Sequence, residues 1–227
     1  MKDSKEISPI AYIYNDFEEK FGIPRQSGKA PSVISRIVFL PEYRDPEAIR
    51  SLDGFSHIWL LFGFSKAETN KFSPTVRPPR LGGNTKVGVF ASRSPYRPNG
   101  IGLSSVKLVG IEDSEKGKVL VVSGADLLSD TPIYDIKPYL VYSDSHPDAI
   151  SGYTENKDDY ELTVDFPPHL KEKIPENMLS GITECLKEDP RPSYQEDPER
   201  IYGMRFGKYN IKFKVEGKIL KVVEVEI

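Results

Sequence analysis

The chain has 227 residues, a formal net charge of −3 and 38% hydrophobic residues, enough to bury a full core in one domain with a small appendage. Its single cysteine excludes a disulfide framework and suits a reducing compartment. The N-terminal stretch 1–6 is too charged for a signal peptide, and the longest apolar run, 58–64, is too short to span a bilayer. These features predict a soluble, cytoplasmic protein.

The first part of the chain is predicted to be mostly strand. Residues 7–14 and 33–40 are apolar, with aromatic and β-branched side chains, and turn formers bound both. Asp45 and Pro46 predict one or two helical turns over residues 45–52, because proline is favoured at the first helical position. The nearly continuous apolar run 55–64 predicts a central strand covered on both faces.

The middle of the chain combines a long loop with three more strands. Residues 69–83 are rich in proline and glycine and have no periodicity, which is typical of a functional loop. Residues 86–91, 104–111 and 119–124 are predicted strands with no long helix between them. Short strands at this spacing indicate an antiparallel barrel or sandwich.

The C-terminal part of the sequence differs in composition from the part that precedes it. A polar stretch follows Tyr142, so we expect a first domain over residues 1–145 and a smaller one over residues 146–227. Residues 168–187 predict a helix that ends in the proline-rich segment 188–194, and residues 201–227 predict strands that turn near Gly217.

The segment 88–105 is predicted to be a stiff binding loop. Pro95 and Pro98 exclude a regular helix, and they present Arg93 and Arg97 from a restrained backbone. The glycines that follow allow another backbone or a ligand to approach closely. Guanidinium forks suit a carboxylate or a phosphate, although a surface turn with two solvated arginines is the plainer alternative.

The charges around this loop favour the binding interpretation. Residues 69–111 contain no Asp or Glu, so the positive field is local in an otherwise slightly acidic chain. A polyanion-binding face needs such a field. The cations of this basic block are Lys71, Arg77, Arg80, Lys86, Arg93, Arg97 and Lys107.

Several familiar chemistries are excluded. The Gly-Ile-Gly segment at 100–102 lacks a third glycine and precedes a strand, so it is not a dinucleotide fingerprint. His57, His146 and His169 have no metal-ligand spacing, which argues against a metal site. Cys185 lies in a helical apolar stripe and is expected to be a packed thiol.

Two further segments carry polar groups beside prolines. Asp126, Asp130 and Asp135 either accept hydrogen bonds from an amino group or ribose hydroxyls, or cap turns. Arg191 stands between two prolines and is either a second substrate contact or part of a helix stop. The residues alone leave both pairs of alternatives open.

Several of these stretches together resemble the TsaA/TrmO-like family of S-adenosylmethionine-dependent tRNA methyltransferases. The match runs from near Ile7 to the C-terminal strands, and it is more specific than any single motif. It rests on Pro24-Arg25-Gln26, on Phe55-Ser56-His57-Ile58-Trp59, on residues 75–84 and 88–105, on Asp130-Thr131-Pro132 with residues 135–139, and on Asp189-Pro190-Arg191-Pro192-Ser193-Tyr194.

The resemblance implies a mainly β fold, an antiparallel single-sheet β-barrel with short helices, plus a small α+β C-terminal domain. It implies a homodimer with S-adenosyl-L-methionine bound near the subunit interface. The implied reaction is methylation of N6 of threonylcarbamoyladenosine next to the anticodon of tRNA. The C-terminal domain would help to engage the tRNA.

The resemblance also assigns site residues. The segment before Thr131 reads Leu-Ser-Asp, where many relatives have Asp-Gly, so Ser129 and Asp130 match the family pattern less well. The implied donor-binding residues are Pro24, Arg25, Gln26, Ser65, Lys66, Arg93, Leu103, Leu128, Ser129, Asp130 and Thr131. Those implied for tRNA are Arg77, Arg80, Arg97, Asp189, Arg191 and Tyr194.

A nearby base would assist methylation of a carbamoylated N6, because the nitrogen lone pair is delocalised while the proton remains. The candidates are Asp130, Asp135, Tyr139 and His57, and the sequence does not choose among them. A non-catalytic RNA-binding module that uses the basic block 69–111 is the alternative function. Saturable binding of S-adenosylmethionine would separate the two.

Overall fold

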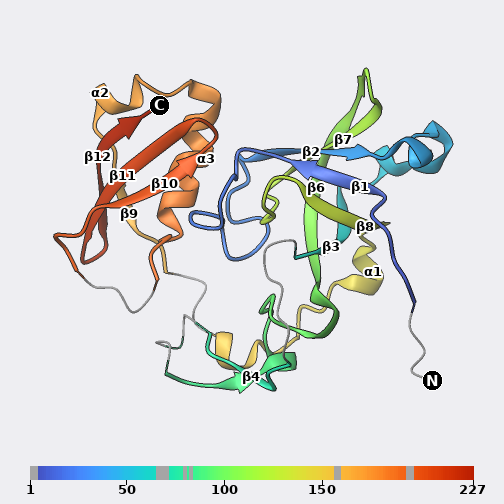
Figure 1. Ribbon diagram of the computed structural model, residues 1–227, viewed down its shortest axis with the longest axis horizontal. Helices are drawn as coiled ribbons and strands as arrows, with labels where there is room; N and C mark the ends of the chain where they lie inside the picture. The colour runs from blue at the N-terminus through green and yellow to red at the C-terminus, as the bar shows by residue number, and fades with distance from the viewer. Residues whose placement is uncertain (1–4, 65–71, 79–80, 82–83, 156–159, 193–196) are drawn as a thin grey trace.

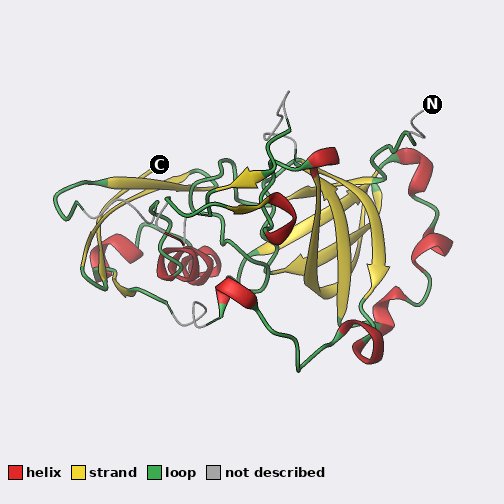
Figure 2. Cartoon of the chain, turned by 90° about the horizontal axis from the view of Figure 1, so that it is seen from below, coloured by secondary structure: helices red, strands yellow, loops and turns green. Residues whose placement is uncertain are grey.

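The computed structural model describes residues 5–64, 72–78, 81, 84–155, 160–192 and 197–227. Figures 1 and 2 show two bodies side by side, a strand-rich one from the first half of the chain and a smaller sheet with helices near the C-terminus. The expectation of a mainly β protein with a large antiparallel sheet and short helices is confirmed.

Six antiparallel strands pair in the ring order β1-β2-β7-β6-β3-β8, and β8 pairs back with β1 to close a barrel. Each strand therefore has two neighbours, and no edge remains for another chain to pair with. The strands are β1 (Ala11–Tyr14), β2 (Ile34–Phe39), β3 (His57–Gly63), β6 (Ile101–Ser114), β7 (Gly117–Ser123) and β8 (Thr131–Pro138).

The barrel encloses one of two cores. Along β6, Ser104, Val106 and Leu108 are buried and alternate with more exposed neighbours, as expected for strands with one face inside. The same alternation in β3 shows that its expected coverage on both faces is wrong, because its outer side chains are only half-buried or exposed. Its apolar run arises because Trp59 and Leu61 are half-buried apolar side chains on the outer face, without a second covering layer.

The smaller body is a four-stranded sheet, in the order β10-β11-β12-β9, with two helices beside it. Its helices pack a second core that includes Ile182, Cys185 and Leu186. The turn predicted near Gly217 joins β11 to β12 as expected. The elements are β9 (Thr163–Asp165), α2 (Pro168–Lys171), α3 (Glu176–Lys187), β10 (Tyr202–Phe206), β11 (Tyr209–Glu216) and β12 (Ile219–Glu226).

The loop between β1 and β2 packs its apolar side chains into this second core. Phe17 is buried there with its ring edge-on to Phe206, the two centroids 5.6 Å apart. Gly22 has a φ of 94°, and a Cβ there would lie 2.4 Å from Met204 Cγ, so only glycine lets the loop approach so closely. The C-terminal body therefore holds the first loop of the barrel in place.

Two predicted elements differ from the observed ones. The helix expected over residues 168–187 is two helices, α2 and α3, because Pro175 lacks an amide hydrogen and interrupts the pattern. The strand expected at 86–91 is only β5 (Val87–Gly88), paired with β4 (Thr75–Val76) and followed by a 3-10 turn. The remaining α-helix is α1 (Val141–Asp144).

The helices in the described part of the chain are short, and α3, with 12 residues, is the longest of them. None is long and apolar enough to cross a membrane.

Candidate active site

A cavity of about 160 Å³ opens at the end of the barrel where β3 finishes and β8 begins. Four segments that are distant in sequence meet around it: the first loop, the end of β3, the loop 88–105 and the segment before β8. The walls are largely apolar, with one carboxylate and one ammonium group among them. The lining residues are Lys20, Ile23, Phe62, Gly63, Phe64, Pro95, Asp126, Leu127, Leu128 and Thr131.

The first loop and the loop 88–105 are joined by two side chains that the resemblance assigns to the donor. Arg93 Nη1 donates to Gln26 Oε1 at 2.5 Å, although 67 positions separate them. Pro24 is buried and Arg25 and Gln26 are half-buried, so the loop exposes only part of its side chains. The structure thus brings Arg93 and Gln26 to one place.

The segment before β8 is held by main-chain hydrogen bonds from β1 and the first loop. Ser129 N donates to Phe17 O and Asp130 N donates to Ile13 O, each at 2.8 Å. Thr131 is buried and its hydroxyl donates to Leu128 O at 2.7 Å. Asp130 has a φ of 63°, the left-handed region that favours glycine and tolerates aspartate. Asp130 can therefore occupy the position at which the resemblance leads us to expect glycine.

Asp126 lines the cavity, and the resemblance did not assign it to the donor site, although the sequence left it open as a hydrogen-bond acceptor for a ligand or as a turn cap. Its Oδ1 accepts a hydrogen bond of 2.6 Å from the hydroxyl of Ser104 on β6. Burial raises the pKa of the Asp126 carboxyl, and hydrogen bonds from Ser104 and the backbone, with the charge of Arg93, only partly oppose this. The one sequence signal was its place in an acidic segment beside prolines, which it shared with Asp130 and Asp135.

Two of the four candidate bases lie at the other end of the barrel. Tyr139 N donates to His57 O, and the two rings are 6.3 Å apart. His57 is at the first residue of β3 and Gly63 at the last, so about 20 Å of strand separates His57 from the cavity. The structure therefore does not bring His57 or Tyr139 to the cavity.

The other two candidates differ from each other. Asp135 is partly exposed and forms an ion pair of 2.8 Å with Lys137. Asp130 is exposed and directly precedes Thr131, a residue of the cavity wall. Among the four candidates, Asp130 is the one that lies beside the cavity.

Three further residues that the resemblance assigns, two to tRNA and one to the donor, differ in how far they are exposed. Arg97 is half-buried and donates from Nη1 to Ser92 O at 3.0 Å, within its own loop. Arg77 is exposed just after β4. Leu103 is 54% exposed on the outer face of β6, beside the exposed Ile101, so it does not line the cavity.

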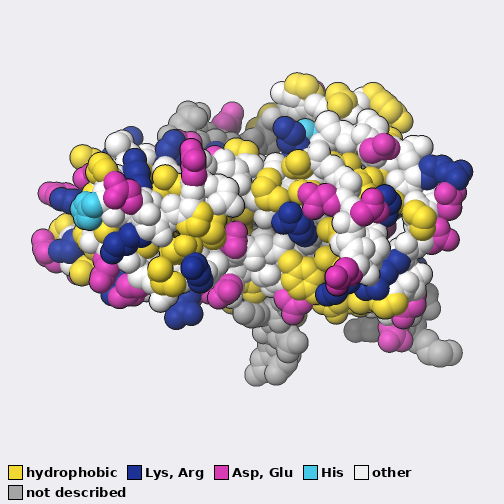
Figure 3. Space-filling view, turned by 90° about the horizontal axis from the view of Figure 1, so that it is seen from above, with side chains coloured by type: hydrophobic (Ala, Val, Ile, Leu, Met, Phe, Trp, Pro, Cys, Tyr) yellow, Lys and Arg dark blue, Asp and Glu magenta, His cyan; other side chains and the backbone are white. Residues whose placement is uncertain are grey.

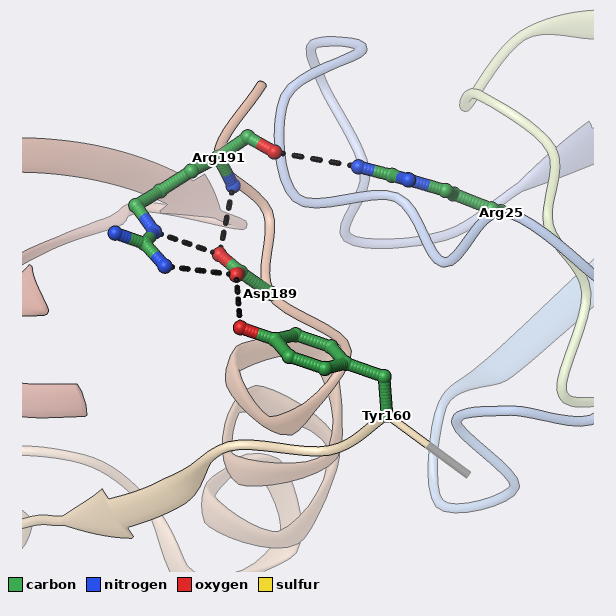
Figure 4. A network of polar contacts seen from close by, with 4 residues as sticks. All are labelled: Arg25, Tyr160, Asp189 and Arg191. Carbon is green, nitrogen blue, oxygen red and sulfur yellow. Dashed lines mark hydrogen bonds and ion pairs between the residues drawn. The ribbon is translucent and has the colours of Figure 1, made fainter. Parts of the chain in front are cut away.

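Arg191 is buried, with its guanidinium bound to the carboxylate of Asp189 (Figure 4). Nε and Nη2 of Arg191 donate to the two oxygens of Asp189 at 2.8 and 2.9 Å, and the Tyr160 hydroxyl donates to Asp189 Oδ2 at 3.3 Å. Arg25 Nη2 donates to the main-chain oxygen of Arg191 at 3.2 Å. The Arg191 side chain thus serves an internal network and does not project toward solvent.

Four residues assigned from the sequence, Ser65, Lys66, Arg80 and Tyr194, lie outside the described residues.

Figure 3 shows no concentration of positive charge on the face that it presents. There, Lys and Arg side chains are interspersed with Asp and Glu over both bodies. In the described part of the chain, no three His, Cys, Asp or Glu side chains are placed to share a metal ion.

Two family models match consecutive parts of this chain. The model described as the tRNA-methyltransferase O N-terminal domain matches residues 12–145, and that of the TrmO C-terminal domain matches residues 159–227.

Individual relatives match over nearly the full length. The tRNA (adenine(37)-N6)-methyltransferase of Escherichia coli K12 is 36% identical, with 98% of each chain covered. A putative S-adenosylmethionine-dependent methyltransferase of Pseudomonas aeruginosa, RcsF, is 42% identical over 88% of this chain and 87% of its own. The crystal structure of TrmO from Pseudomonas aeruginosa superposes with a TM-score of 0.79 at 34% identity, covering 99% of this chain and all of that one.

Proposed function

Since the chain belongs to the tRNA-methyltransferase O family, we propose that it transfers a methyl group from S-adenosylmethionine to N6 of adenosine 37 in tRNA. The family match covers both bodies of the fold, so the proposal concerns the whole chain and not an isolated module. On this proposal the protein works in the cytoplasm, where its tRNA substrate is found.

One observation supports the proposal most directly. Gln26, Arg93, Leu128 and Thr131, which the resemblance assigns to the donor, come from three segments that meet at or beside one cavity. Leu103 does not join them, since it lies on the outer face of the barrel. An apolar pocket with a few placed polar groups is the usual form of a small-molecule site.

The chemical character of the described lining residues suits S-adenosylmethionine, although the cavity is small. Phe62 and Phe64 offer apolar aromatic surface for a flat ring, and Asp126 and the nearby Lys20 offer polar contacts. Pockets for drug-sized ligands usually measure about 300 to 1,000 Å³. A cavity of about 160 Å³ would therefore enclose only part of the donor.

We propose that a second copy of the chain completes the site, as the resemblance implies. The small cavity leaves part of the donor to be covered. Ile101, Leu103, Phe90 and Tyr96 are exposed apolar side chains in the loop 88–105 and at the start of β6. A homodimer that covers them would bury surface that is costly to leave in water.

When bound, S-adenosylmethionine would supply the methyl carbon on a sulfonium. The residues of this chain would hold N6 close to that carbon and in line with the bond to sulfur, and such alignment can lower a barrier by roughly 7 to 11 kcal/mol. The bond from N6 to carbon forms as the bond from carbon to sulfur breaks, and the N6 proton passes to a base. Asp130 is our candidate for that base, because it lies beside the cavity.

We further propose that the accepted base is threonylcarbamoyladenosine. Its threonyl group adds a carboxylate, and the described part of the basic block presents Arg77, which is exposed, and Arg97, which is half-buried. These side chains would also meet tRNA phosphates, so binding should weaken as salt rises. Asp189 and Arg191 would act on tRNA indirectly, by fixing the shape of their loop.

Mass spectrometry of tRNA nucleosides after incubation with isotopically labelled donor tests the proposal. Two tRNA preparations are compared, one carrying threonylcarbamoyladenosine at position 37 and one with unmodified adenosine there. We expect label on N6 of position 37 in the first preparation. Label only in the second would contradict the threonylcarbamoyl substrate, and tRNA binding without label in either, or without saturable donor binding, would favour a non-catalytic RNA-binding module.

A further inference from the structure

Asp126 joins three of the segments that meet at the cavity. Its carboxylate accepts from Ser104, which follows Leu103 on β6, and from the backbone of Ser27, which follows Gln26 in the first loop. It also precedes Leu127 and Leu128, two residues of the cavity wall. A single carboxylate is thus placed where the donor-binding segments converge.

Among the described residues, this carboxylate has polar partners but no ion-pair partner. Its contacts among the described residues are a hydroxyl and main-chain groups, while the guanidinium of Arg93 acts on it from a distance and donates to Gln26. Burial accordingly raises its pKa. Asp126 is half-buried, and a carboxylate that is partly removed from water without an ion pair is costly; proteins keep such groups chiefly at functional sites.

Among the described residues that line the cavity, no other side chain is acidic. Phe62, Phe64 and Leu127 are apolar, and Lys20 carries a charge of the opposite sign. A ligand group that replaces water beside Asp126 therefore gains most if it is positively charged. A neutral or anionic group would leave the carboxylate unpaired.

We propose that Asp126 binds a cationic group of the methyl donor. The inference rests on the proposed function, because it takes S-adenosylmethionine as the ligand of this cavity. The donor has two positively charged groups, the α-ammonium and the sulfonium, and both would pair with a carboxylate. The product S-adenosylhomocysteine keeps the ammonium and has a neutral sulfur. Comparing the two ligands therefore shows which of the two cationic groups Asp126 binds.

The substitution Asp126→Asn tests this inference, because asparagine keeps an acceptor for Ser104 and removes the charge. We expect affinity for S-adenosylmethionine, measured by isothermal titration calorimetry, to fall about tenfold or more. An equal loss for S-adenosylhomocysteine would assign the ammonium, and a loss confined to S-adenosylmethionine would assign the sulfonium. Unchanged affinity for both ligands would overturn the inference.

A thermal unfolding measurement without ligand separates this role from a structural one. If Asp126 is kept for binding, Asp126→Asn should unfold at a higher temperature at pH 8, since the cost of the buried charge disappears. The raised pKa of Asp126 leads to the same expectation. Its charged form lowers the folding stability above that pKa, and this loss of stability disappears when acidification protonates the carboxylate. Wild-type donor affinity should also weaken on acidification, and that of Asp126→Asn should weaken less. A lower unfolding temperature for Asp126→Asn would contradict the inference, since it would show that the charge stabilises the fold.

The matched control is Asp113→Asn, on the strand that carries Ser104. Asp113 is exposed near the far end of β6, nine residues from Ser104 and so about 30 Å away, where it pairs with Lys118 at 2.8 Å. This substitution changes the net charge equally and should leave both affinities unchanged. If the unsubstituted protein binds neither ligand, the proposed function fails as well. If it binds and methylates while Asp126→Asn binds as tightly, the inference about Asp126 alone fails.

Discussion

Arg25 donates a hydrogen bond from Nη2 to the main-chain oxygen of Arg191, 3.2 Å away, across 166 positions of sequence. The first of these residues is in the loop expected to contact the methyl donor, and the second is in the segment expected to engage tRNA. The contact joins the barrel's first loop to the C-terminal body, beside the packing of Phe17 on Phe206. A disturbance at Arg191 is therefore expected to reach the donor site.

Asp189→Asn should destabilise the protein strongly. The Asp189 and Arg191 side chains are 14% and 9% exposed, and loss of one partner from a buried pair leaves an uncompensated charge that costs about 3 kcal/mol or more. Asparagine tolerates the left-handed backbone of Asp189, whose φ is 50°, so the effect comes from the charge. Urea unfolding measures it. Tyr160→Phe, which loses only the 3.3 Å contact, should change stability by no more than about 1 kcal/mol.

Gly102→Ala should close the cavity from within the barrel. A Cβ at Gly102 would lie 2.3 Å from Cζ of Phe62, so the ring would have to move, and it lines the cavity. Overpacking of this kind costs about 1 to 3 kcal/mol, and donor affinity should fall with it. Gly110→Ala on the same strand is the control, because nothing lies within 4 Å of its added methyl. Equal donor affinity in the two variants would show that Phe62 does not shape the donor site.

Arg93 and Arg77 should separate donor binding from tRNA binding. Arg93→Ala removes the contact with Gln26 and should weaken donor binding. Arg77→Ala removes an exposed cation of the basic block and should reduce the slope of log affinity for tRNA against log salt by about one, with donor affinity unchanged. Calorimetry with the donor and filter binding with tRNA at several salt concentrations measure the two effects. Intact donor binding in Arg93→Ala would remove that residue from the donor site.

Cys185 should not react with thiol reagents in the folded protein. Burial is the main cause that raises the pKa of its thiol well above the usual range, and the neighbouring Glu184 and Glu188 add to this. The reactive thiolate is therefore scarce at pH 8, and the side chain is also inaccessible. A disulfide reagent such as dithionitrobenzoate should label it only in denaturant, with free glutathione as the reference. Rapid labelling under native conditions would contradict the packed environment.

Local patterns predicted much of the secondary structure because they depend on neighbours in sequence. Alternating burial in β2, β6 and β11 follows from one covered face, and the turn after Glu216 follows from Gly217. Where the pattern misled, the reason was tertiary. The apolar run of β3 was interpreted as a doubly covered strand, whereas its outer residues lie on a barrel surface.

The roles of the candidate residues depended on register, which sequence spacing does not reveal. Asp135 and Tyr139 lie within nine residues of Asp130, and His57 begins the neighbouring strand β3, yet among these four only Asp130 lies at the cavity end of the barrel. The resemblance implied that Arg191 meets tRNA, and the structure turns its guanidinium inward to Asp189.

The sequence by itself determined the mainly β fold, the basic block and the resemblance to tRNA methyltransferases, because composition, periodicity and motifs are local or additive. Only the tertiary structure decided that Arg93 lies against Gln26 and that Asp126 lies in the cavity wall against Ser104. Those neighbours meet because the barrel closes and its strands pair in one register, and their environments follow from burial, which no single segment specifies.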